Sequence, residues 1–343
     1  MRSRSKLPIV ALIYDFDGTL ADSTGNIPQN VREKIKYFIA NGGIFTVCTG
    51  RTMQGFHRYA PDIINAPVLC SNGMMAYDYA KHKTVFADTM KEDAEKLIKA
   101  VLGKYPDMCI ELYCDNFETF VINPDERTRN HLEGQNIAYS VIISLDEIDV
   151  SLVKLMIGVG EKSAEVQKLL AGIDLGKVRP IPSDGAFLEI VSTTSDKGKG
   201  LYRLADILSV PHNRVFAVGD GSNDVDMLTD AFLSFVPENA EEKAKKAGDV
   251  FVCSNDDGAV SEAIDIIEEF AAKGSIIALS DAGVGAAFCK AALYGASLNV
   301  FINTKSMANR EYAEGLNKEA QEMMAVYGAK ADAVFEGVNA RLK

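Results

Sequence analysis

The amino-acid sequence predicts an α/β protein with a parallel-sheet core, an inserted α+β domain and an extra C-terminal α/β unit. Short apolar runs that end in polar clusters alternate with helical periodicity in about the first 80 residues, and this alternation resumes near residue 199. Between these two segments the pattern changes. Alternating strand and helix signals are typical of a parallel sheet. A length of 343 residues allows about two or three domains.

The first part of the core is predicted to contain three strands and one helix. The apolar runs 9–14, 44–48 and 68–70 are predicted to be strands, and each ends in a polar cluster. Pro28 marks a helix start, because proline is favoured at the first helical position, and Asn41-Gly42-Gly43 ends that helix. Strand, helix and strand in succession indicate parallel neighbours.

Residues 84–186 are predicted to form the inserted domain, between core segments 1–83 and 187–274. Its predicted elements are a helix at 92–102, strands at 108–113 and 117–122, a further strand at 152–159 and a helix at 163–170. The core then resumes with a helix at 199–208 and strands at 215–218, 233–236 and 250–253. Two segments of one domain therefore flank an insertion.

Residues 275–343 are predicted to be a further strand and helix unit of unknown role. The expected elements are strands at 276–279 and 298–302, a helix at 282–294 between them, and long helical stretches afterwards. The helix begins with small residues, which permit close packing. The unit could extend the core sheet, mediate formation of a homodimer, or form a separate module.

Composition excludes several classes of partner and location. A net charge of −12 provides no basic surface for nucleic acid or anionic lipid. The apolar stretch 276–302 contains Asp281 and Lys290, which argues against a membrane span. The basic start 1–6 precedes an apolar run that is too short for a signal peptide, and six scattered cysteines fit free thiols in a reducing compartment. We expect a cytoplasmic protein.

Acidic residues follow two of the predicted core strands. Asp15 and Asp17 end the first strand and, being two residues apart in an extended segment, face the same side. Asp220 and Asp224 follow the strand at 215–218. Ligands of open parallel sheets bind beyond the carboxyl ends of the strands, so these carboxylates should converge. They would repel one another without a cation, and hard oxygen ligands favour Mg²⁺.

Two further segments provide phosphate-binding groups at the same edge. Thr49-Gly50-Arg51 ends the second strand and offers a hydroxyl, backbone N–H groups and a helix start. Lys197 supplies a positive charge that phosphate and clustered carboxylates need. Together these residues predict a Mg²⁺-dependent phosphate site.

In this order, the motifs resemble the haloacid dehalogenase (HAD) superfamily of phosphohydrolases. The four motifs are Asp15-Phe16-Asp17-Gly18-Thr19, Thr49-Gly50-Arg51, Lys197, and the segment 219–227 that begins Gly219-Asp220-Gly221. The insertion between the second and third resembles the large α/β cap of the Cof-like sugar-phosphatase branch, and Ser71-Asn72-Gly73 is similar to a turn of that branch. The resemblance implies a Rossmann-like core. It covers residues 7–272 and leaves out the C-terminal unit.

The resemblance also implies a role for each motif residue. Asp15 would be the nucleophile that forms an aspartyl-phosphate, and Asp17 would be the general acid and base. Thr49 and Lys197 would hold phosphoryl oxygens. Substrate and phosphate contacts are assigned to Gly18, Thr19, Gly50, Arg51, Asn72 and Asn223. Metal ligation is assigned to Asp15, the backbone carbonyl of Asp17, Asp220 and Asp224, the last of which could instead orient Lys197.

The predicted function is that of a Mg²⁺-dependent phosphatase for a small phosphorylated metabolite, a sugar or polyol phosphate. A phosphomutase or phosphotransferase with the same intermediate, a phospho-receiver regulator and a non-catalytic phosphate binder are the alternatives. The four histidines show no ligand spacing, so surface or packing roles are expected for them. In the insertion, Glu111, Tyr113, Asn116 and Glu118 could face substrate, although strand alternation explains them equally well.

Overall fold

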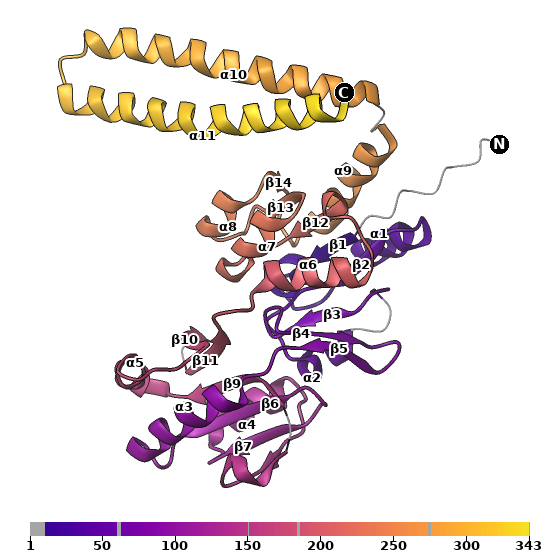
Figure 1. Ribbon diagram of the computed structural model, residues 1–343, viewed down its shortest axis with the longest axis vertical. Coiled ribbons are helices and arrows are strands. Elements are labelled where there is room, and N and C mark those ends of the chain that lie inside the picture. The colour runs from indigo at the N-terminus through magenta and orange to yellow at the C-terminus, as the bar shows by residue number, and fades with distance from the viewer. Residues whose placement is uncertain (1–10, 60–62, 150, 184–185, 274–275, 343) are drawn as a thin grey trace. The chain divides into compact units, whose positions relative to one another are not determined.

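The computed structural model describes residues 11–59, 63–149, 151–183, 186–273 and 276–342. The chain forms two compact units, Met1–Ile266 and Ile267–Lys343 (Figure 1). Residues 1–10, with the basic start and the first two residues of the predicted strand 9–14, lie outside the described residues. The division of the first unit at 83/84 and 186/187 stays a prediction.

The core sheet is parallel, as predicted. Its strand order is β14-β13-β12-β1-β2, with β1 at Ala11–Tyr14, β2 at Ile44–Val47, β12 at Val215–Val218, β13 at Leu233–Pro237 and β14 at Val250–Val252. The two strands β1 and β12 are neighbours, with Tyr14 opposite Val218. Asp15 and Gly219 therefore leave the sheet side by side at the same edge. All of β1 is buried, which explains why it reads as a continuous apolar run.

The core helices include two predicted ones, after Pro28 and at 199–208, whose observed bounds differ from the prediction by at most two residues. The core helices are α1 at Gln29–Ala40, α2 at Met53–Phe56, α6 at Lys197–Ile207, α7 at Val225–Asp230, α8 at Glu242–Ala247 and α9 at Ala259–Lys273. In α1, the side chains of Val31, Ile35 and Phe38 recur at helical spacing and are buried. Short helical turns lie at Phe16–Leu20, His57–Tyr59, His212–Arg214 and Ser222–Asp224.

The strand predicted at 68–70 exists but belongs to another sheet. The strands β3 (Val68–Cys70), β4 (Met75–Asp78) and β5 (Lys83–Ala87) form an antiparallel sheet, which touches the core sheet through a bridge between Cys48 and Leu69. Ser71, Asn72 and Gly73 all have positive φ and reverse the chain, so β3 pairs with the strand that follows at once. The prediction placed this strand in the parallel sheet. The bridge to Cys48 is parallel, so β3 does run alongside the end of β2, but its ladder pairs it with β4 in a separate sheet.

The inserted part of the chain is α+β, as predicted, and its sheet also includes residues 187–192, which the sequence assigned to the core. Its sheet, called the cap sheet below, has the order β10-β11-β9-β6-β7-β8, with β6 at Cys109–Cys114, β7 at Thr119–Ile122, β8 at Ser140–Val141, β9 at Leu152–Gly158, β10 at Val178–Ser183 and β11 at Phe187–Ser192. The helices are α3 at Lys91–Lys104, α4 at Glu126–Gly134 and α5 at Ser163–Ala171, with short turns at Leu145–Glu147 and Gly160–Lys162. One face of the sheet packs Ile110, Leu112 and Leu155 against apolar side chains of α3 and α5. Residues at alternate positions lie on the other face.

The second unit contains two long helices rather than strands. The helices α10 (Ile276–Lys305) and α11 (Arg310–Leu342) run antiparallel as a hairpin (Figure 1). The strands predicted at 276–279 and 298–302 were therefore wrong, and the unit cannot extend the core sheet. Short apolar runs do not distinguish a strand from a helix, and only isolated glycines interrupt α10. By length and composition alone, Val284–Lys305 is sufficient to cross a membrane.

Candidate active site

Asp15 and Lys197 form a buried ion pair at the edge of the core sheet. Asp15 directly follows β1, and its backbone N–H still bonds to the β12 carbonyl of Val218 at 2.9 Å. Lys197 is the first residue of α6 and is fully buried. Its Nζ donates to Asp15 Oδ1 and to Asp224 Oδ1, each at 2.6 Å. Burying a charge is costly unless it is paired, so these contacts fix all three side chains.

Asp224 uses both carboxylate oxygens within the protein. Oδ1 accepts from Lys197, and Oδ2 accepts from the backbone N–H groups of Asp220 at 3.0 Å and Gly221 at 2.8 Å. A Cβ at Gly219 would lie 2.6 Å from Cβ of Asp224, so glycine is needed there. Asp224 therefore holds Lys197 and the loop after β12 in place, which supports the orienting role left open by the sequence.

Asp220 packs closely against the turn that follows Asp15. Its Oδ1 accepts a 2.5 Å hydrogen bond from Thr19 Oγ1. Gly18 has a φ of +80°, and a Cβ at this position would lie 2.3 Å from Asp220 Oδ2. The carbonyl oxygen of Gly18 accepts from Asn239 Nδ2 at 2.8 Å, a contact that the sequence did not predict.

The carboxylates of this site fit a hard divalent cation. Oxygens of Asp15, Asp220 and Asp224 lie within 4.8 Å of one another, and among the described residues Lys197 alone forms ion pairs with this group, through Asp15 and Asp224. Burial, together with the charge of Asp224, raises the pKa of Asp15 to about 8 in spite of Lys197, and burial raises the pKa of Asp220 to about 6. A carboxylate oxygen can accept more than one partner, so the oxygens of Asp15 and Asp220 that already accept a hydrogen bond can also contact an ion, and within the described part of the chain the second oxygen of Asp15 stays free.

Asp17 lies outside this group of carboxylates. Its side chain is 55% exposed and accepts from Arg51 Nε at 2.7 Å and from Arg51 Nη2 at 2.6 Å. This hydrogen bonding to Asp17 raises the pKa of Arg51 above its ordinary value. The guanidinium also lies over the rings of Phe16 and Tyr59, 5.2 and 5.4 Å from their centres.

Thr49, Gly50 and Asn72 adjoin one another, because the backbone N–H of Asn72 donates to the carbonyl oxygen of Thr49 at 3.0 Å. Thr49 is buried, and its Oγ1 accepts from the backbone N–H of Arg51 at 3.1 Å. Asn72 lies between the two parts of the first unit, because its Nδ2 donates to Glu189 of the cap sheet at 3.2 Å and its Oδ1 accepts from Asn223 Nδ2 at 3.1 Å. All residues predicted for the site are therefore neighbours, although Thr49, Lys197 and Asp224 lie beneath the surface.

A cavity of about 1130 Å³ joins this site to the cap sheet. Its lining includes Asp15, Asp17, Arg51, Asn72, Asp220 and Asn223 from the predicted site. Further lining residues come from the cap sheet, from α4 and from the residue after α4: Tyr113, His131, Gln135, Lys154, Met156, Arg179 and Glu189. A substrate bound through its phosphate at Asp15 would therefore extend towards the cap residues.

The sequence named Glu111 and Tyr113 among residues that could face substrate, but it missed Lys154 and Glu189, the other buried charges of the cap sheet. Lys154 Nζ contacts Glu189 Oε2 at 3.2 Å and donates to the carbonyl oxygen of Gly50 at 2.9 Å. Glu111 is fully buried, accepts from Tyr113 Oη at 2.6 Å and contacts His131 Nδ1 at 2.9 Å. Each of these three charges lies inside an otherwise apolar strand, and that interruption is the signal that could have identified them.

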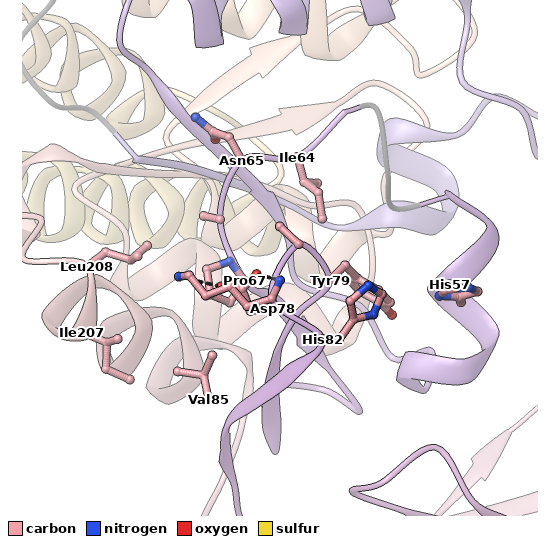
Figure 2. Close-up of a pocket in the computed structure, with 13 residues that line it drawn as sticks. His57, Ile64, Asn65, Pro67, Asp78, Tyr79, His82, Val85, Ile207 and Leu208 are labelled. Atoms are coloured by element: carbon pink, nitrogen blue, oxygen red, sulfur yellow. Dashed lines mark hydrogen bonds and ion pairs between the residues drawn. The ribbon is translucent and has the colours of Figure 1, made fainter.

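A second cavity, of about 720 Å³, is lined by a different set of residues that includes His57, Tyr79, His82 and Ile207 (Figure 2). Within the part of the chain that the structure describes, the residues predicted for catalysis do not line it. The candidate active site is therefore the cavity at Asp15.

Two families match parts of the sequence. Residues 12–264 match the haloacid dehalogenase-like hydrolases, and residues 252–322 match the family described as formiminotransferase-cyclodeaminase. The first match covers the core, the cap sheet and every predicted site residue. The second covers much of the helical hairpin, which the motif resemblance left out.

Individual relatives are similar to the first unit in length and fold. The 5-amino-6-(5-phospho-D-ribitylamino)uracil phosphatase YwtE of Bacillus subtilis is 25% identical over 284 residues, which are 74% of this chain and 96% of the relative. A haloacid dehalogenase-like hydrolase from Bacteroides thetaiotaomicron superposes with a TM-score of 0.69 at 25% identity, covering 76% of this chain and all of that chain. A HAD subclass IIB sugar phosphatase shares the fold, with a TM-score of 0.61 at 18% identity over 76% of this chain and 99% of that one.

Proposed function

Because the chain belongs to the haloacid dehalogenase-like hydrolase family and is a phosphatase of that family, we propose that it hydrolyses a small sugar or polyol phosphate with bound Mg²⁺. The resemblance found in the motifs is thereby confirmed. The single observation that carries the proposal is the buried cluster of Asp15, Lys197 and Asp224 beside Asp220, which combines a fixed nucleophile with a site for a cation.

In the proposed reaction, Asp15 attacks phosphorus. Lys197 holds Oδ1 of Asp15, so the other oxygen forms the new bond to phosphorus while the bond to the leaving oxygen breaks. Asp17 donates a proton to that oxygen, then removes a proton from the water that attacks the aspartyl-phosphate. Inorganic phosphate leaves, and the Asp15 carboxylate is restored. Mg²⁺ held by Asp15 and Asp220 would neutralise charge on the phosphoryl oxygens.

Arg51 must release Asp17 before this proton transfer. Both nitrogens of the guanidinium fork are bonded to the two oxygens of Asp17, which leaves the carboxyl group no free oxygen directed at a substrate. An incoming phosphate offers Arg51 alternative oxygen partners of greater charge. Arg51 therefore contributes to phosphate binding and also uncovers the general acid.

The leaving group is proposed to be a carbon chain that carries several hydroxyl groups. The walls of the cavity beyond Asp15 include amide, carboxylate, ammonium and phenol groups, which bond hydroxyls well. The relative from Bacillus subtilis is named for the phosphate ester of a ribityl chain, which is a polyol. The phosphomutase and phospho-receiver hypotheses are not favoured, because the relatives are named phosphatases. We also propose that the protein is located in the cytoplasm.

The test is phosphate release from a panel of sugar, polyol, nucleotide and cofactor phosphates, with Mg²⁺ and with EDTA. We expect turnover of a polyol or sugar phosphate that needs the metal and that Asp15→Asn abolishes. Turnover that Asp15→Asn retains would contradict the nucleophile. Activity confined to nucleotides would contradict the leaving group while leaving the reaction type in place.

A further inference from the structure

The helix α10 exposes a continuous apolar stripe, of which Ala291 also borders a hollow shared with Ala331 and Phe335 of α11. The stripe consists of Val284, Phe288, Ala291, Gly295, Leu298 and Ile302. Their spacing alternates between four and three residues, which keeps them on one face of a helix over about 27 Å. Phe288 is 71% exposed, Leu298 is 68% exposed and Ile302 is 61% exposed.

A separate set of residues on α10 already contacts α11. Ser297 and Thr304 are buried in the hairpin, Thr304 Oγ1 donates to Asn317 Oδ1 at 2.7 Å, and Lys290 Nζ donates to Asp332 Oδ1 at 2.6 Å. The stripe lies on nearly the opposite side of the helix from Ser297 and Thr304, so a single hairpin cannot cover it. On α11 the exposed apolar side chains include Tyr312, Met323, Val326, Tyr327, Val334 and Phe335, with the charged Glu319 and Lys330 among them.

The stripe is symmetric about residue 293. Val284 and Ile302 are equally distant from this position, as are Phe288 and Leu298, and as are Ala291 and Gly295. Large residues thus occupy both ends and small residues the centre. Two copies of α10 laid antiparallel across a two-fold axis would place each large residue against a large one, while the small centre lets the backbones approach. Self-complementarity of this kind is what a symmetric dimer interface requires.

The charges at the ends of α10 obey the same symmetry. Asp281 and Lys305 are also equally distant from residue 293, so the antiparallel arrangement places opposite charges at equivalent positions of the two copies. A parallel arrangement would instead place like charges together. We propose that α10 is the interface of a homodimer, in which the stripes of two copies pack antiparallel about Ala291 and Gly295.

A lipid bilayer is a less suitable partner for the same helix. The stretch Val284–Lys305 is long and apolar enough to span one, but α11 packs along it and carries charged side chains over the same length, including Lys318, Glu322 and Lys330. Each such charge costs about 2.5–3.5 kcal/mol at the centre of a membrane helix. A second copy of α10 covers the stripe without burying the charges of α11.

The first measurement is the mass of the full chain by light scattering after size exclusion, over a wide range of protein concentration. We expect twice the chain mass of 37.2 kDa. A monomer at every concentration would overturn the proposal. So would a monomer that co-sediments with vesicles of phosphatidylcholine and phosphatidylglycerol, because that result would identify the stripe as a membrane surface.

A charge-swap series tests the register. Phe288→Glu and Leu298→Lys should each weaken dimerisation by about 100-fold. Each substitution buries two unpaired charges in the interface, one from each copy. The double variant should recover most of the affinity, since the antiparallel register places the introduced carboxylate at 288 against the introduced ammonium at 298 of the other copy. Ala296→Glu adds a charge to an exposed position outside the stripe and serves as the matched control.

Circular dichroism checks that every variant retains its helices. If the single variants stay dimeric, the interface lies elsewhere and the proposal fails. If the double variant is as monomeric as the singles, the antiparallel register is wrong, since a parallel pairing would place like charges at 288 together.

Discussion

The core site and the cap sheet both bury charged side chains, but they balance those charges differently. At the core site, Asp15 and Asp224 share one ammonium group, and Asp220 lies beside them. In the cap sheet, Lys154 is matched by Glu189, and Glu111 is held by Tyr113 and His131. The first cluster has an excess of carboxylates, whereas the second satisfies its charges internally.

This difference indicates different functions for the two clusters. A cluster with excess negative charge favours a cation and supports chemistry at phosphorus, whereas a satisfied network is rigid and presents fixed polar groups to a ligand. The two are in contact, because Lys154 donates to Gly50 and Asn72 donates to Glu189. We infer that the core cluster determines the rate of the reaction and the cap cluster determines which substrate binds.

The largest expected effect comes from removing the one ammonium group of the core cluster. Lys197→Met leaves Asp15 and Asp224 buried without their cation, so we expect a loss of about 3–5 kcal/mol in the free energy of unfolding. We also expect kcat to fall by about 1000-fold or more, since the nucleophile is no longer fixed. Urea unfolding and steady-state phosphate release measure the two effects.

Lys199→Met is the matched control for this prediction. Lys199 is two residues away on α6, is exposed and pairs with Asp196 on the surface at 2.8 Å. Ion pairs on the protein surface contribute little to the free energy of unfolding, so both stability and kcat should stay close to those of the wild type. Equal effects of the two substitutions would contradict the central role of Lys197.

The core cluster was largely predictable from the sequence, whereas the cap cluster was not. Asp15, Asp17, Thr49 and Asp220 directly follow apolar strands, and parallel topology brings strand ends together. Lys154 lies in the middle of a strand, and its partner Glu189 is on another strand far along the chain. The pairing depends on strand register, which local patterns do not define. The helix α10 was misassigned because its short apolar runs suit either a strand or a helix.

The excess of carboxylates at the core site predicts a smaller effect, on pH-dependent stability. The pKa of Asp15 is raised from 3.8 to about 8 in the folded protein. A raised pKa means that the folded state favours the protonated carboxyl group. The contribution of Asp15 to the free energy of unfolding is therefore complete below pH 4 and is lost as the pH rises towards 8. Without metal, the melting temperature should therefore fall between pH 5 and pH 8.

Mg²⁺ should reverse this trend, because it binds the deprotonated carboxylates and releases protons. Asp15→Asn should remove most of the pH dependence, because its side chain cannot titrate. Scanning fluorimetry at several pH values, with EDTA or with Mg²⁺, measures both effects. A metal-free melting temperature that rises over this range in the wild type would contradict the assignment to Asp15.

The smallest expected effect comes from the satisfied cap cluster. Lys154→Met should raise KM by about 10-fold and change kcat by less than about 3-fold, because Lys154 lines the cavity away from the reacting atoms. Lys168→Met, at an exposed position on α5, is the control. A purely structural role is separated by the double variant Lys154→Met/Glu189→Leu, which leaves neither charge of the pair buried without a partner. Stability should then recover while KM stays high, whereas recovery of both would mean that the pair only supports the cap sheet and that substrate is recognised elsewhere.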